Sequence, residues 1–301
     1  MRNPNALKKS PGDKLFTGIS LVILSIIMIS IFYPMWVVLI ASLSNPTRIY
    51  ETKFLIWIRD LTVDSYKLVF ENQNFIIGFI NSVLYTIVGT IVNVIMNICA
   101  AYPLSKNNFK GKSFFTLMFT FTMFFSGGLI PSYLLMNQLK LLNNFWVMII
   151  PSAVNMFNVI VMRTYFQSRI PQELEEAAKV DGCTNFRLLI KIVLPLSVPI
   201  LAVISLYYGV GHWNDFFTAL VYITDKKLFP LQMVLRSILL QNQLMGAFDQ
   251  IAADEGYALR MMARMGLKYA VIVVSTVPIF IVYPLVQKFF AKGVMVGAIK
   301  G

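Results

Sequence analysis

Residues Pro171–Pro199 read PQELEEAAKVDGCTNFRLLIKIVLPLSVP, a polar and charged stretch between two long apolar runs. Pro171 can occupy the first position of a helix, where a backbone N–H would have no partner in any case. Gly182 stands where a left-handed residue would end that helix, and Thr184 can cap a second one. The stretch therefore predicts two short helices that meet at an angle.

Each predicted helix repeats residues at i, i+3, i+4 and i+7, which places them on one stripe of its surface. The positions are Leu174, Ala177, Ala178 and Asp181 in the first helix, and Phe186, Leu189, Ile190 and Val193 in the second. We expect the alanine stripe to be exposed, so that a cleft on another protein can contact it closely. Pro195 marks the start of the next apolar run.

The spacing of these residues resembles the EAA loop of ABC importer permeases. That pattern is EAA, three residues, Gly, nine residues and I-x-L-P, and here it runs from Glu176 to Pro195. Sugar permeases of the family commonly carry an Asp before the Gly, as Asp181 does here. The alternative is a surface helical hairpin whose Glu and Ala reflect ordinary helix propensity. The resemblance implies ATPase coupling by Glu176, Ala177, Ala178, Asp181, Gly182, Phe186, Leu194 and Pro195.

The composition is that of a membrane protein. Hydrophobic residues make up 57% of the 301 residues and charged ones 13%, with a mean hydropathy of +0.69; soluble domains average about 25% charged residues. Two cysteines and one histidine give little support for a disulfide framework or a metal centre.

Six apolar segments are long enough to cross a bilayer, which takes about 20 residues. They are residues 17–42, 75–101, 114–136, 145–166, 196–223 and 269–290. We therefore expect an all-α integral membrane protein in which 17–290 form a six-helix transmembrane domain. The EAA loop covers 167–195, and residues 1–16 and 291–301 form tails on one side.

The basic residues indicate which side that is. Residues 1–16 hold four basic residues and one acidic residue, and residues 102–113 hold three basic and none acidic. Residues 43–75 are balanced, with four of each. By the positive-inside rule, both tails and the EAA loop are cytoplasmic. The net charge of +12 then follows mostly from topology, and no nucleic-acid partner is expected.

Polar residues inside the fifth segment suggest a substrate pathway, because such residues are costly in a membrane. The sequence GHWNDFFTAL, residues 211–220, contains His212, Trp213, Asn214 and Asp215. An indole that stacks on a sugar, with an amide and a carboxylate for its hydroxyls, would form a carbohydrate site. The alternative is that Trp213 anchors at an interface and the other two bond helix to helix.

Gly127 and Gly128, followed by Pro131, interrupt the third segment. They predict an unwound stretch whose backbone faces a cavity on the substrate pathway. Close helix packing through small residues is the alternative.

The ending QKFFAKGVMVGAIKG, residues 287–301, resembles the tail of the maltose-type permease that lacks extra N-terminal spans. That tail reaches the interface between ATPase subunits, which would make Lys300 and Gly301 contacts. A basic, positive-inside tail is an equal alternative.

The chain has no G-x-x-x-x-G-K-[ST] loop, so it would not hydrolyse ATP by that route and is not expected to be an enzyme. Over nearly its whole length it resembles permease subunits of type I ABC importers for carbohydrates. The stretches MFFSGGLIPSYLL and FPLQMVLRSIL resemble the subgroup for oligosaccharides, including those from plant or uronate-containing polysaccharides.

The resemblance implies several partners in a bacterial plasma membrane. They are a homologous second permease, an ATPase dimer that binds ATP and Mg²⁺, an extracytoplasmic solute-binding protein and the lipid bilayer. No cofactor is expected on this chain. The alternatives are an ABC importer for another solute class, an ion-coupled secondary carrier using Asp215, and a membrane enzyme or scaffold.

Overall fold

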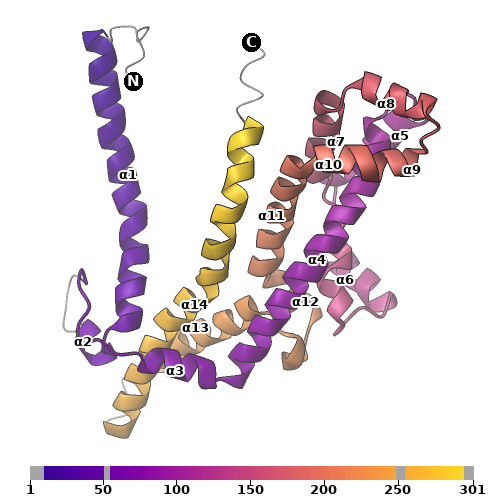
Figure 1. Cartoon of the computed structure of the whole chain (residues 1–301). Helices are drawn as coiled ribbons and strands as arrows, with labels where there is room; N and C mark the ends of the chain where they lie inside the picture. Colours follow the sequence, from indigo (N-terminus) through magenta and orange to yellow (C-terminus); the bar gives the residue numbers. More distant parts are fainter. Residues whose placement is uncertain (1–9, 51–54, 249–254, 295–301) are drawn as a thin grey trace. The chain divides into compact units, whose positions relative to one another are not determined.

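The computed structural model describes residues 10–50, 55–248 and 255–294 (Figure 1). Within these ranges the regular structure is helical, apart from an isolated β-bridge between Ser44 and Leu61. The predicted all-α class is therefore confirmed. The chain divides into two compact units, Met1–Glu71 with Asn242–Val273, and Asn72–Gln241 with Val274–Gly301.

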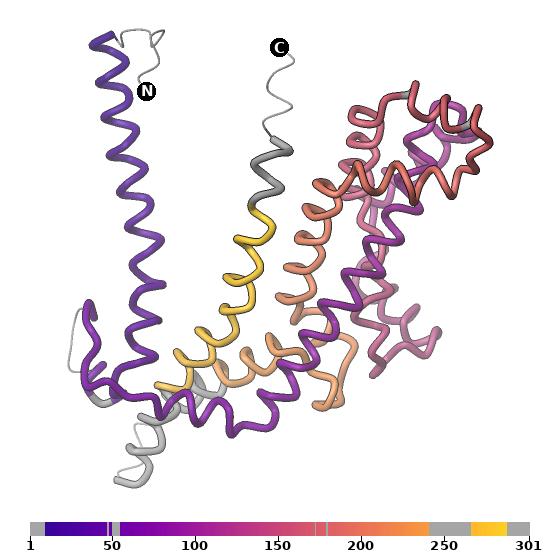
Figure 2. Tube along the Cα trace, in the orientation of Figure 1, coloured from indigo at the N-terminus to yellow at the C-terminus, as the bar shows by residue number. Residues whose placement is uncertain are grey.

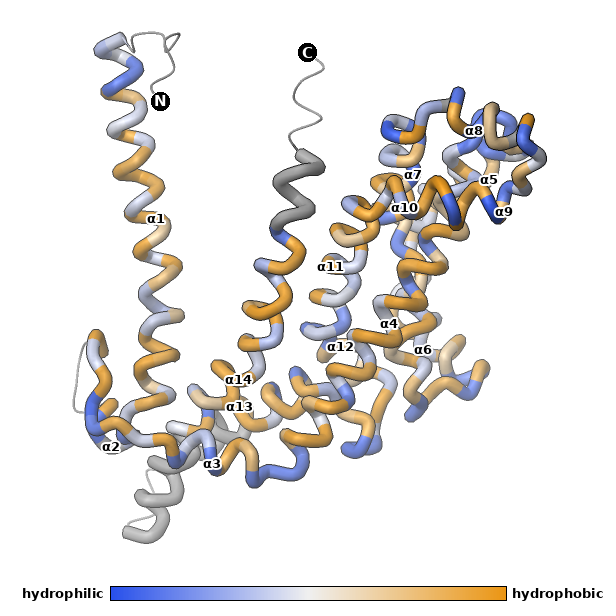
Figure 3. The backbone as a smooth tube through the Cα atoms, in the orientation of Figure 1, coloured by the Kyte–Doolittle hydropathy of each residue, from blue (hydrophilic) through white to orange (hydrophobic). Residues whose placement is uncertain are grey.

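The first unit begins with a long apolar helix, α1 (Pro11–Leu43). Ser10 and Asp13 start it with a capping box, in which the Ser10 N–H donates to Asp13 Oδ2 at 3.0 Å. Figure 3 shows hydrophobic residues along its length, and most of them are exposed within the chain. A helix that is apolar on all sides is typical of a membrane span.

Two short helices follow α1 in the first unit. They are α2 (Pro46–Tyr50) and α3 (Asp64–Glu71), and the Ser42 and Tyr66 hydroxyls lie 2.7 Å apart. The last helix, α14 (Glu255–Val294), begins in this unit and ends in the second.

The second unit holds most of the helices and the EAA loop. Its first elements are α4 (Gln73–Ser105), α5 (Lys112–Phe124), α6 (Leu129–Gln138), the 3-10 turns η1 (Phe145–Met148) and η2 (Ile150–Ser152), and α7 (Met156–Arg169). The loop comprises α8 (Gln172–Val180), α9 (Asn185–Leu188), the π-helix η3 (Leu189–Val193) and α10 (Leu194–Leu196). It is followed by α11 (Val198–Asn214), α12 (Phe217–Tyr222), the 3-10 turn η4 (Lys226–Leu228) and α13 (Leu231–Phe248).

Helix α4 is the centre of this unit. It packs along α11 and α7, and Figure 2 shows α11 running beside it. The close approach to α11 depends on Gly89, because a Cβ there would lie 2.7 Å from Cδ2 and Cε1 of the His212 ring. A hydrophobic cluster that includes Met162, Leu188 and Ile204 fills the space between α4, α7, α11 and the loop.

Three of the helices are long and apolar enough to cross a membrane within the described residues: α1, α4 and the Gly266–Gln287 part of α14. Three bent pairs raise the number to six if each pair is one span. The bends are 116° between α5 and α6, 54° between Phe145–Ser152 and α7, and 83° between Asn185–Leu196 and α11. The way these helices cross the bilayer stays a prediction.

The fifth apolar segment differs from the continuous helix predicted for residues 196–223. Its main helix, α11, starts at Val198 rather than at Leu196, and Asp215–Phe216 separate it from α12. The reason is local: the Leu194 N–H donates to Leu189 O in the π-helix, and Pro195 needs no hydrogen-bond acceptor. The chain therefore stays helical past Pro195 and turns at Ser197.

Candidate functional site

The EAA loop folds as the two short helices that its sequence predicts. Gly182 has a φ of +75°, and the Cys183 N–H donates to Ala178 O at 2.9 Å. The Thr184 hydroxyl accepts the Arg187 N–H at 3.4 Å and caps α9. Since the left-handed region favours glycine, Gly182 ends α8 and sets the angle at which the chain leaves it.

The predicted stripe of exposed alanines is wrong in one respect. Ala177 is exposed, but Ala178 is only 9% exposed and packs in the hydrophobic cluster beneath the loop. Successive residues of a helix point about 100° apart, and here that step turns Ala178 toward the cluster while Ala177 stays exposed. Glu176 and Asp181 lie on the exposed side with Ala177.

The second predicted stripe is also wrong, because residues 189–193 form a π-helix. The wider turn changes the register, so Phe186 is 71% exposed whereas Val193 is fully buried. Leu194 is half-buried and Pro195 is exposed. The loop thus presents Val180, at 88% exposed, and Phe186 as apolar side chains on its surface.

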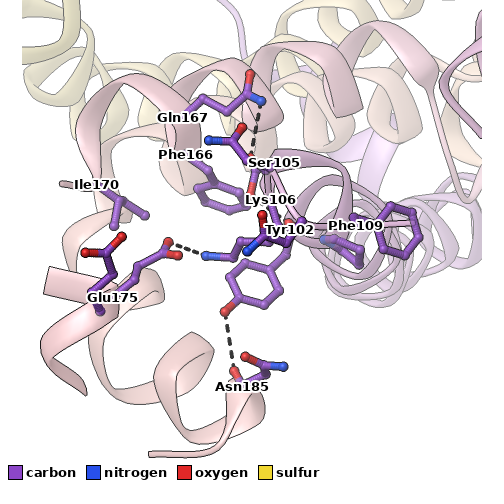
Figure 4. A pocket seen from close by; sticks show the side chains of 13 residues that line it. Tyr102, Ser105, Lys106, Phe109, Phe166, Gln167, Ile170, Glu175 and Asn185 are labelled. Atoms are coloured by element: carbon purple, nitrogen blue, oxygen red, sulfur yellow. Dashed lines mark hydrogen bonds and ion pairs between the residues drawn. The ribbon is translucent and has the colours of Figure 1, made fainter. Parts of the chain in front are cut away.

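A cavity of about 620 Å³ lies between this loop and the end of α4. Figure 4 shows it from close by. Its lining residues are Tyr102, Pro103, Ser105, Lys106, Asn107, Asn108, Phe109, Phe166, Gln167, Ile170, Glu175, Glu176 and Asn185.

Polar contacts join the end of α4 to the loop across this cavity. Lys106 Nζ forms an ion pair with Glu175 Oε1 and lies 4.3 Å from the centre of the Tyr102 ring. The Tyr102 hydroxyl donates to Asn185 O at 3.4 Å, and Gln167 Nε2 donates to Ser105 O at 3.2 Å. The sequence prediction included none of these residues in the site; the only hint was that Lys106 is the first basic residue after the second apolar run.

The four polar residues predicted for the substrate pathway lie in different surroundings. His212 and Trp213 are each 5% exposed, whereas Asn214 is exposed and Asp215 half-buried. The Trp213 indole N–H donates to Ser275 O at 3.0 Å, and its ring makes an edge contact with Phe79. The indole is thus buried with its N–H bonded, and the structure does not offer it as an open stacking surface.

The two neighbouring polar side chains bond locally. Asn214 Nδ2 donates to Val210 O at 2.9 Å in its own helix, and Asp215 Oδ1 accepts the Thr218 N–H at 3.0 Å at the start of α12. Both side chains thus have structural hydrogen bonds, as the alternative to a sugar site predicted, although to nearby backbone rather than from helix to helix. Asn214 and Asp215 remain the accessible members of the predicted set.

Trp213 also lines an apolar cavity of about 220 Å³ between α4, α11 and α14. Its other lining residues are Thr86, Ala202, Ser205, Leu206, Gly209, Val210, Pro278, Ile279, Val282 and Val286. Few of these groups can bond to sugar hydroxyls, so this cavity is a poor carbohydrate site.

Gly127 and Gly128 lie in the non-helical break between α5 and α6, as predicted. Gly128 has a φ of +87°, and a Cβ on it would meet nothing within 4 Å. A Cβ on Gly127 would meet only Pro131, at 3.6 Å. Close packing within this chain therefore does not explain these glycines, whereas the bend does.

Two further predictions concern the C-terminal tail and a metal centre. Lys300 and Gly301 lie outside the described residues. Among the described residues, no group of three or more His, Cys, Asp or Glu side chains could hold a metal ion.

The fold and the loop define a class of protein, the helical membrane subunits that carry a solute across a bilayer. Residues 75–296 match the family of binding-protein-dependent transport system inner membrane components, and the chain belongs to that family. It is the permease component of an ABC importer, a membrane protein that is not itself an enzyme.

The chain is similar to two proteins of Bacillus subtilis. It is 40% identical to Protein LplC of Bacillus subtilis (strain 168) over 270 residues, which cover 89% of each chain. It is 37% identical to the polygalacturonan/rhamnogalacturonan transport system permease protein YtcP of the same strain, over 88% of this chain and 91% of that one.

A solved structure supports the fold. The match is a chain from the crystal structure of a bacterial ABC transporter involved in the import of the acidic polysaccharide alginate. The TM-score is 0.85 and the identity 31%, and the match covers 95% of this chain and all of that one. The predicted type I importer permease fold is thereby confirmed.

Proposed function

We propose that this chain carries an acidic oligosaccharide, released from a uronate-containing polysaccharide, across the membrane into the cytoplasm. The observation that supports this most is the agreement of two relatives. One is named for polygalacturonan/rhamnogalacturonan transport, and the structural neighbour is described as importing alginate. Each aligns with this chain over at least 88% of its length.

A cation beside exposed aromatic rings supports an acidic substrate. Phe216 and Phe217, at the break between α11 and α12, are 40% and 54% exposed. The Arg236 guanidinium lies 5.8 Å from the centre of the Phe216 ring. Aromatic faces suit sugar rings, and a guanidinium can bind a carboxylate through two parallel hydrogen bonds.

Uptake by membrane vesicles that contain the complete complex tests the substrate class. Arg236→Gln should reduce uptake of a uronate oligosaccharide about tenfold and leave uptake of a neutral one of the same length within twofold. Asn214→Ala should weaken uptake of both. Equal transport of the acidic and neutral sugars by the unaltered complex would refute the acidic-substrate proposal.

The EAA loop is proposed to couple this chain to an ATPase dimer that binds ATP and Mg²⁺. Exposed Val180 and Phe186 offer apolar side chains that a cleft on another protein could bury. Closure of the ATPase dimer would move this loop and its counterpart on a second, homologous permease. The helices would then switch from inward- to outward-facing as rigid bodies, and an extracytoplasmic binding protein would release the sugar into them.

This coupling proposal places the loop and both termini in the cytoplasm. Glu176→Lys should abolish uptake while the protein still inserts and reaches normal levels in the membrane. Labelling of a cysteine placed at Glu176 from outside intact cells would refute the orientation. Purification of the unaltered complex without any ATP-hydrolysing subunit would refute the coupling itself.

A further inference from the structure

The last residues of α4 contact three successive parts of the EAA loop region. Ser105 O accepts a hydrogen bond from Gln167 at the end of α7, Lys106 pairs with Glu175 on α8, and Tyr102 donates to Asn185 O on α9. Figure 4 shows these contacts around one cavity. The loop is therefore fixed to one helix end by polar contacts, in addition to the hydrophobic cluster beneath it.

The ion pair is the charged member of this set, and it is largely removed from water. The side chain of Lys106 is 24% exposed and that of Glu175 is 16% exposed. The ion pairs Arg48–Asp60 and Lys67–Asp64 are much more open to water, since at least 55% of each of their side chains is exposed. Solvent screens a covered pair less, and the Tyr102 ring adds a cation–π contact to the ammonium.

Glu175 and Glu176 both line this cavity and differ in how far they are covered. Glu175 is half-buried and pairs with Lys106 at the end of α4, whereas Glu176, the glutamate of the EAA pattern, is exposed. Helix α8 thus carries one carboxylate that is bonded to α4 and, next to it, one that solvent reaches.

We propose that Lys106 and Glu175 are positioning residues for energy coupling: their ion pair fixes α8 to the end of α4, so that displacement of α8 by the ATPase moves α4 with it. This inference rests on the proposed ATPase coupling. Loss of one partner would leave the other charge covered and unpaired, which is more disruptive than loss of both.

The test uses the complete transporter in proteoliposomes and measures solute import and ATP hydrolysis in the same sample. Lys106→Met and Glu175→Gln should each reduce the number of solute molecules imported per ATP about tenfold. Misfolding lowers import and hydrolysis together because it removes active complexes, so it leaves this ratio unchanged. The charge-swapped chain, Lys106→Glu with Glu175→Lys, should raise this ratio about threefold above that of either single variant. Recovery is incomplete because a carboxylate over the Tyr102 ring is unfavourable.

Lys110→Met is the matched control, since Lys110 is an exposed lysine on the same connection and its loss should change the ratio less than twofold. A ratio unchanged in both single variants, or a swapped chain no better than either of them, would overturn the inference. If a single variant fails to assemble, the charge-swapped chain provides the test. Restored assembly and import in that chain would support the ion pair, and loss of both would contradict it. An unaltered complex that imports without hydrolysing ATP would instead refute the proposed function.

Discussion

Replacement of Gly89 by Ala tests the packing of α4 on α11. A Cβ at this position would lie 2.7 Å from two carbons of the His212 ring and would also contact its Nε2. His212 is 5% exposed, so the ring has little room to move away. Overpacking of this kind costs about 1–3 kcal/mol. Alanine in a helix interior gains about 0.5–1 kcal/mol over glycine, so the net loss of stability is about 0–2.5 kcal/mol.

Gly209→Ala is the matched control, because Gly209 lies on the same pair of helices. A Cβ there would meet Thr90 Oγ1 at 3.6 Å, which is ordinary van der Waals contact. This variant should therefore show the helix-propensity gain alone, about 0.5–1 kcal/mol. The two alanine variants should then differ by about 1–3 kcal/mol, or roughly 5-fold to 150-fold in the unfolding equilibrium.

The assay is unfolding of the purified full chain in mixed micelles by increasing SDS, followed by tryptophan fluorescence. His212→Ala provides the second half of a double-mutant cycle. In that background the ring is absent, so Gly89→Ala should be neutral or stabilising. Equal stability of Gly89→Ala and Gly209→Ala, or additive effects of Gly89→Ala and His212→Ala, would refute the assigned contact.

Three further predictions concern hydrogen bonds and backbone conformation. Tyr208→Phe should cost about 1–3 kcal/mol in the same assay, since its buried hydroxyl accepts from Asn97 Nδ2 at 2.5 Å and from the Asn155 N–H at 2.9 Å; a loss below 0.5 kcal/mol would contradict this role. Gly182→Ala should cost about 1–2 kcal/mol of backbone strain without any steric collision, and Gly182→Asn should cost less. Import should therefore fall further for the Ala variant than for the Asn variant, and the reverse order would be inconsistent with the turn. Thr184→Ala should cost about 1 kcal/mol and speed hydrogen exchange of the amides in α9; unchanged exchange would show that the cap contributes nothing.

The local features of the EAA loop were predictable from its sequence because they depend on single residues. Gly182 is the residue that a left-handed helix end favours, and Thr184 is a favoured helix cap. The bend in the third apolar segment was predictable for the same reason, from the glycines near Pro131. Such signals need no knowledge of what the segment packs against.

The faces of the loop were not predictable, because they depend on packing. Periodicity cannot decide which of Ala177 and Ala178 is buried, since the cluster beneath the loop makes that choice. It also assumes 3.6 residues per turn, and the π-helix at residues 189–193 breaks that assumption between Phe186 and Val193.

Contacts between distant parts of the chain were also beyond the sequence pattern. Lys106 and Glu175 are 69 residues apart, and Trp213 reaches the Ser275 carbonyl across 62 residues. Without the fold, Trp213 had an aromatic ring beside polar residues, which also fits a sugar site. The structure shows that its ring is buried and its N–H is used, so accessible aromatic side chains such as Phe216 are the better candidates.

The contacts of α4 suggest how a movement at the EAA loop reaches the other end of the second unit. Near its start, Asn81 Nδ2 donates to Lys227 O and Phe229 O, and the Tyr85 hydroxyl donates to Leu228 O, which ties α4 to η4. At its end, Lys106 pairs with the loop. About 25 residues separate these ties, or roughly 37 Å of helix at about 1.5 Å per residue. A helix stretches little along its axis because each turn is hydrogen-bonded to the next. A displacement of α8, which is bonded to one end of α4, would therefore be transmitted along α4 to the connection that follows α12. Phe216 and Arg236 lie on either side of that connection in the sequence, and the ion pair and the sugar contacts would therefore act through the same rigid element.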